Sequence, residues 1–159
     1  MKNTLSSNAA MYERCKNVLK DLPSEVIDEI HSRIKKEFMS LPCRVEFLAE
    51  ELNDLEEVKR KYVETGVLSI SSLHNDSELL PGSINLAFRV WHDFVHIQFN
   101  YPFDYEGEYN TWKVQSKGLS YLARQVLYSE IVLQTAYSLH NGFFPKKQKV
   151  VLVNIENEL

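Results

Sequence analysis

The chain has 159 residues, of which 44% are hydrophobic and 25% charged, and its formal net charge is −4. These values are typical of one globular domain, and the acidic balance argues against general nucleic-acid binding, which requires a basic face. The first eight residues lack an apolar signal core and no run reaches membrane-spanning length, so a cytoplasmic protein without membrane contact is expected. Cys15 and Cys43, the two cysteines, are then expected to be free thiols.

The first half of the chain predicts three helices. Apolar residues recur at helical spacing over 10–22 and again over 23–38. Asp54 and Gly66 indicate the two ends of a third helix, because aspartate caps helix N-termini and glycine adopts the left-handed conformation that ends them. Residues 44–47 are expected to form a short extended piece, and the alternating Val67–Ser71 predicts a strand.

The second half predicts a helical core. The apolar run 84–99 reads as a buried helix that Pro102 ends. A further helix begins near residue 108, and a long one covers 119–139. The tail residues 150–153 predict a strand that pairs with Val67–Ser71. The fold class is therefore mainly α: one bundle-like domain over 1–159 with a minor strand pair or hairpin, divided into helices 8–65, a motif-bearing core 83–142 and a tail 143–159.

Two histidines interrupt the apolar run 84–99. His92 and His96 are four residues apart, so on a helix their imidazoles project from one face and can converge on one ion. Ionisable groups in apolar surroundings cost free energy unless a metal or a hydrogen-bond network satisfies them. A helix-interface pair that hydrogen-bonds to backbone or carboxylate is the alternative interpretation.

Two glutamates are the candidates to complete a metal site. Glu108 lies at the start of a predicted helix, and Glu130 lies within a nearly all-apolar helix. A carboxylate in such surroundings needs a cation, a metal or a donor as partner, and a salt bridge from Arg124 or Arg89 would also serve. Three helices of a bundle can bring His92, His96, Glu108 and Glu130 to one interior point around a divalent Zn, Fe or Mn ion.

Four neighbouring side chains are predicted to support this site. Asp93 would orient a histidine, pair with Arg89 one turn earlier, or act with Glu108 and Glu130 in catalysis. Arg89 and Gln134 are predicted to bind substrate, and Trp112, one turn after Glu108, would form a wall of the site.

The order of these residues resembles a family of proteins encoded by bacteriophages and mobile elements. The family pattern is FRxxHD, a second histidine, GExxxW, an E-T-R-G-Q segment and a Q-K segment. The counterparts here are Phe88-Arg89 with His92-Asp93, His96, Gly107-Glu108 with Trp112, Glu130 with Gln134, and Gln148-Lys149. The chain departs from the pattern at three places. Val95 replaces a glycine before the second histidine, with a histidine spacing of four in place of five, and Gln115 replaces a histidine after the tryptophan. Ile131-Val132-Leu133 replaces Thr-Arg-Gly. The resemblance implies phage-type origin and a metal-dependent site, without a defined reaction.

Four functions remain open at this stage. The first is a metal-dependent hydrolase that acts on an unidentified small-molecule or polymer substrate, with a remaining carboxylate as base. The second is an HD-type phosphohydrolase, suggested by His74 and the His92-Asp93 dyad, and the third is a carboxylate-bridged di-iron site. The fourth is a non-enzymatic accessory or virion protein that binds a host or phage protein through the aromatic loop Tyr101 to Tyr109.

Overall fold

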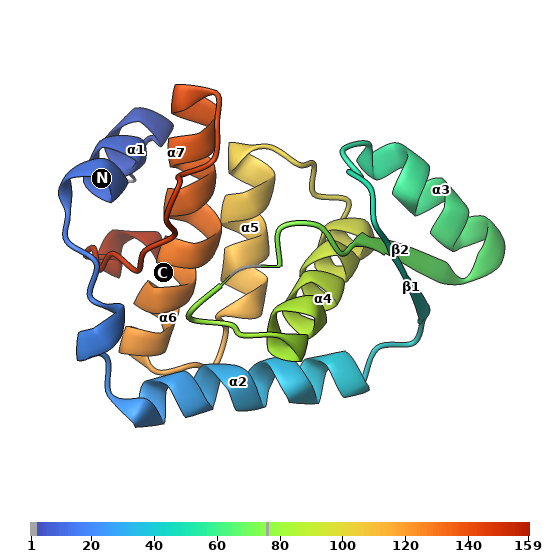
Figure 1. Cartoon of the computed structure of the whole chain (residues 1–159), viewed down its shortest axis with the longest axis horizontal. Helices are drawn as coiled ribbons and strands as arrows, with labels where there is room; N and C mark the ends of the chain where they lie inside the picture. Colours follow the sequence, from blue (N-terminus) through green and yellow to red (C-terminus); the bar gives the residue numbers. More distant parts are fainter. Residues whose placement is uncertain (1–2, 76) are drawn as a thin grey trace. The chain divides into compact units, whose positions relative to one another are not determined.

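A computed structural model describes residues 3–75 and 77–159. Figure 1 shows a mainly α chain with one short parallel strand pair, as predicted. Its contacts divide it into two compact units, Met1–Ile30 with Asp104–Leu159, and His31–Phe103. The predicted single domain stays a prediction. None of the helices within the described ranges combines the length and apolar character needed to span a bilayer.

The unit His31–Phe103 holds the strand pair, the helices α3 and α4 and part of α2. Its elements are the second part of α2 (Ser24–Met39), β1 (Arg44–Leu48), α3 (Leu55–Thr65), β2 (Val67–Ser71) and α4 (Ser83–Phe99). The backbone amides of Glu56 and Glu57 donate to Asp54 Oδ1 (3.0 and 3.3 Å) at the start of α3, and Gly66 ends it at φ 71°. Both predicted ends of this helix are confirmed.

The partner of the second strand was predicted wrongly. β2 pairs in parallel with β1, with Arg44 opposite Val67, and not with the tail. A parallel pair needs a crossover, which α3 supplies. Apolar side chains from the strands, α3 and α4 form one hydrophobic cluster in this unit, and the buried members of the cluster are Val58, Leu68, Ile70, Val90 and Ile97.

The other unit packs helices around aromatic side chains. It contains α1 (Leu5–Arg14), η1 (Leu19–Asp21), the start of α2, α5 (Tyr105–Gln115), α6 (Tyr121–Tyr128), the π-helical turn η2 (Ser129–Leu133), α7 (Gln134–Asn141) and η3 (Glu156–Glu158). Helix α1 packs along α7 (Figure 1). The predicted helix 10–22 is wrong in its bounds, because the Thr4 hydroxyl accepts from the Ser7 amide (3.1 Å) and starts the helix earlier.

The tail is extended without forming a strand. The Val18 amide donates to the Val150 carbonyl (2.9 Å), and the Val151 amide donates to Ser129 Oγ (2.8 Å). Val150, Val151 and Val153 are buried. The apolar character of these valines therefore serves burial within their own unit.

Candidate functional site

The end of α4 is held in one conformation by its C-terminal turn. Asn100 adopts the left-handed conformation (φ 55°), which asparagine tolerates better than most residues. The following amide, of Tyr101, donates to the His96 carbonyl at 2.9 Å. Pro102 cannot continue a helix, so the chain leaves α4 here, as the sequence predicts.

The side chain of His96 joins the same turn. His96 is fully buried, and its Nδ1 lies 2.9 Å from the Tyr101 carbonyl oxygen. A carbonyl oxygen only accepts hydrogen bonds, so Nδ1 carries the proton and donates. In the neutral ring, Nε2 then carries the lone pair, which is the form that binds metal ions.

The two imidazoles meet as their spacing predicts. His92 Nε2 and His96 Nε2 lie 3.2 Å apart, and the ring centroids are 4.7 Å apart. Two metal–nitrogen bonds of about 2.0–2.1 Å produce this separation at an angle of roughly 100° at the ion. The pair therefore fits two ligand positions of one first-row metal ion.

Aromatic rings flank the pair on both sides. Phe88 lies 5.6 Å from the His92 ring between centroids, and Phe103 lies 4.7 Å from the His96 ring. These contacts give the imidazoles an apolar surround. An ion bound there would interact with its ligands more strongly than in water, because the local dielectric constant is lower.

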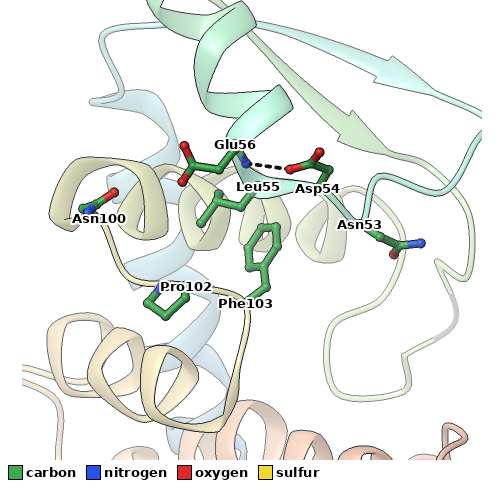
Figure 2. Close-up of a pocket in the computed structure, with 7 residues that line it drawn as sticks. All are labelled: Asn53, Asp54, Leu55, Glu56, Asn100, Pro102 and Phe103. Carbon is green, nitrogen blue, oxygen red and sulfur yellow. Dashed lines mark hydrogen bonds between the residues drawn. The ribbon is translucent and has the colours of Figure 1, made fainter.

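A pocket in the same unit shares Phe103 with the surround of His96. Figure 2 shows its seven lining residues, and its volume is about 590 Å³. They come from the start of α3 and from the segment after α4: Asn53, Asp54, Leu55, Glu56, Asn100, Pro102 and Phe103. Phe103 thus contributes both to the pocket wall and to the surround of His96.

Arg89 holds the loop that follows β2. Its guanidinium donates to the carbonyls of Ser71 (2.9 Å), Leu73 (2.5 Å) and His74 (2.6 Å). Burial lowers the pKa of Arg89, while the nearby carboxylate of Asp93 raises it. The charge of Asp93 therefore acts on Arg89, and the predicted pairing of the two side chains stays a prediction. The predicted contacts of Arg89 and Asp93 with a substrate stay predictions.

The structure does not favour the HD-type interpretation. His74 Nε2 lies 2.9 Å from Glu51 Oε1, in an ion pair whose side chains are mostly exposed. Within the described residues, neither His74 nor Asp93 belongs to a group of three potential metal ligands. An HD-type metal centre would need both His74 and Asp93 as metal ligands.

Glu108 and Trp112 lie on α5 in the other unit. Asp104 caps this helix by accepting from the Gly107 amide at 2.8 Å, which places half-buried Glu108 in the first turn. Trp112 is fully buried, donates to the Arg124 carbonyl at 3.0 Å and packs against Tyr128. These contacts give Trp112 a core role. The predicted substrate contact of Trp112 stays a prediction.

The predicted aromatic loop Tyr101 to Tyr109 is shorter than expected. Asp104 starts α5 at Tyr105, so Tyr105 and Tyr109 are helical. The Tyr105 hydroxyl accepts from Asn8 Nδ2 (2.8 Å), and the Tyr109 hydroxyl donates to the Glu158 carbonyl (3.2 Å). Both rings are thus fixed inside their own unit, and this argues against using them as contacts for a partner protein.

Glu130 and Gln134 form a second polar group in this unit. Glu130 lies in the π-helical turn η2, and such turns are frequent at functional sites. Loss of hydration raises the pKa of Glu130 to about 7. Burial also raises the pKa of Tyr12, and the nearby charge of Glu130 raises this pKa further. A side-chain hydrogen bond between Tyr12 and Gln134 lowers it. The predicted metal ligation by Glu130 and substrate contact by Gln134 stay predictions.

Two features of the site escaped the sequence analysis. The Tyr101 carbonyl, which fixes the His96 ring, belongs to the backbone and has no residue signature. The pocket joins residues about fifty positions apart, and no spacing rule connects them. The segment Asn100-Tyr101-Pro102 predicts the end of a helix, but its sequence does not indicate that the Tyr101 carbonyl accepts a hydrogen bond from His96.

Comparisons with known proteins add no assignment. No protein-family model, no curated protein and no solved structure matches the chain. The resemblance to phage and mobile-element proteins therefore stays a prediction, as does the cytoplasmic location.

The raised pKa of Glu130 predicts a pH-dependent stability. The folded-state pKa near 7 exceeds the unfolded value of about 4.3, so the folded chain binds the extra proton between these pH values. Stability therefore falls as pH rises through this window, and the loss is complete above it. The free energy of unfolding of Glu130→Gln should exceed that of the wild type by on the order of 2 kcal/mol near pH 8 and equal it near pH 4.

Urea unfolding across this pH range measures the effect. Glu64→Gln, which changes an exposed carboxylate on α3, is the matched control and should follow the wild-type profile. Identical pH profiles for Glu130→Gln and the wild type would show that the Glu130 carboxyl is well hydrated.

Proposed function

We propose that this protein is a metal-dependent hydrolase whose ion is bound by His92, His96 and Glu108. The observation that carries the proposal is the 3.2 Å separation of the two Nε2 atoms, with His96 Nδ1 bonded to the Tyr101 carbonyl. A histidine ligand that donates its other ring proton to a carbonyl is the usual arrangement in protein metal sites. Histidine nitrogens and a carboxylate oxygen are ligands that first-row metal ions accept, and His92, His96 and Glu108 are of these residue types.

Chain connectivity supports Glu108 as the third ligand. His96 lies in the last turn of α4 and Glu108 in the first turn of α5. Five residues, 100–104, separate the two helices, so the linker limits how far the Glu108 carboxylate can be from the pair. Its position at a helix N-terminus also suits a negative charge.

The donor set supports a catalytic rather than a purely structural ion. Two histidines and one glutamate, with a further position open, recur in catalytic zinc sites, whereas closed four-ligand sets are structural. When bound, the ion would polarise a substrate carbonyl or phosphoryl group and lower the pKa of water. The chain's own residues would hold and orient the ligands: the Tyr101 carbonyl fixes the His96 ring, and Phe88 and Phe103 flank the two imidazoles.

Metal content of the purified chain tests the ligand assignment. After dialysis against Zn²⁺ or Mn²⁺, the wild type should retain about one ion per chain by elemental analysis. His92→Ala and His96→Ala should lose it, and Glu108→Gln should weaken binding by about tenfold or more. His140→Ala, which changes an exposed histidine at the end of α7, is the control. Equal metal retention in all four variants would overturn the proposal.

Cobalt spectroscopy distinguishes a catalytic from a structural ion. Co²⁺ bound at an open site should give a visible absorption spectrum that shifts when acetohydroxamate is added, because the hydroxamate enters the open position. The His96→Ala variant should give no such spectrum. A Co²⁺ spectrum that hydroxamate leaves unchanged would indicate a closed, structural site and would contradict the proposed hydrolase function.

A further inference from the structure

The pocket of Figure 2 combines an acidic rim with an apolar interior. Two of its lining side chains, Asp54 at the N-cap of α3 and Glu56 in its first turn, are exposed carboxylates. The lining contains no lysine, arginine or histidine. The Lys59 ammonium lies beside the rim, bonded to Asn100, so two carboxylates stand against one ammonium and the rim keeps a net negative charge that favours cations over anions such as phosphate esters.

The capping hydrogen bonds at the start of α3 use only one of the two carboxylate oxygens of Asp54. Both backbone amides that bond to Asp54 end on the same oxygen, Oδ1. The cap therefore does not consume Oδ2. Figure 2 shows the Glu56 carboxylate on the Asn100 side of the pocket, apart from the Asp54 carboxylate. Two separate carboxylates match the several N–H donors of a planar cation.

The interior of the pocket suits a ring or an aliphatic chain. Leu55, Pro102 and Phe103 supply its apolar surface, and Leu55 and Phe103 are half-buried. Figure 2 shows Leu55 and the Phe103 ring between the α3 carboxylates and Pro102. An aromatic ring also attracts a cation over its face.

Asn100 and Phe103 connect this pocket to the histidines. Lys59 Nζ donates to Asn100 Oδ1 (2.6 Å), which holds one wall, and Asn100 is the residue whose left-handed conformation ends α4. The Phe103 ring lies against the buried His96 ring. The Phe103 ring thus borders both the pocket and His96.

We infer that the pocket is the substrate subsite of the histidine centre, and that it selects an amidinium, guanidinium or ammonium group attached to an apolar moiety. As a substrate subsite it rests on the proposed function, whereas cation binding in the pocket does not. The inference narrows the substrate class to amine-bearing or guanidine-bearing molecules and excludes phosphate esters.

Three isosteric probes test the selection by charge. Benzamidine, benzamide and benzoate share one planar shape and carry positive, neutral and negative charge. In NMR titrations of the full chain at low salt, benzamidine should bind at least about tenfold more tightly than benzamide. The shifted amides should lie in 53–56 and 100–103, and benzoate should not bind.

Charge-removing variants link the selection to the rim. Asp54→Asn retains the cap, because asparagine caps helices as well as aspartate does, and Glu56→Gln retains the shape. The double variant should lose the preference for benzamidine. Glu57→Gln, an exposed carboxylate on the same turn that does not line the pocket, is the matched control and should retain the preference. Equal affinity for benzamidine and benzamide in the wild type would overturn the inference.

Bound Mn²⁺ tests whether the pocket serves the histidine centre. With Mn²⁺ bound, the ring protons of benzamidine should broaden strongly, and His92→Ala should abolish the broadening while benzamidine still binds. Sharp benzamidine signals in a chain that binds both Mn²⁺ and benzamidine would overturn the subsite. Failure of the proposed function has a different signature: no Mn²⁺ is retained, and charge-selective benzamidine binding persists.

Discussion

Two hydrogen bonds between His96 and Tyr101 determine the local structure of the site. The Tyr101 amide donates to the His96 carbonyl, and the His96 ring donates back to the Tyr101 carbonyl, both at 2.9 Å. The first bond ends the helix and the second fixes the ring and its tautomer. His96 therefore presents Nε2 to His92 without needing a separate side chain to orient it.

The same short segment also builds the pocket. Asn100 ends α4 and lines the pocket, and Phe103 lines the pocket and packs on His96. Helix end, imidazole orientation and pocket wall thus depend on four consecutive residues. Arg89 contributes from one side by binding three carbonyls of the loop after β2, which stabilises the unit that carries both histidines.

Much of the fold could be predicted because its signals are local. Asp54 and Gly66 end their helix through interactions with neighbouring residues, and the run 84–99 shows helix α4 by composition alone. The partner of β2 could not be predicted, because five alternating residues match several strands equally well. The approach of His92 to His96 could be predicted, because residues four positions apart on a helix lie on the same face. The carboxylates of α5 and η2 were grouped with it by residue type, and residue type carries no distance.

The central claim is that both imidazoles bind one metal ion. X-ray absorption spectroscopy of the zinc-loaded chain tests it directly, because multiple scattering from imidazole rings reports the number of histidine ligands. The account predicts two imidazole nitrogens at about 2.0–2.1 Å, oxygen in the remaining positions and no sulfur. Sulfur at about 2.3 Å, which would indicate Cys15 or Cys43, or fewer than two imidazoles, would contradict it.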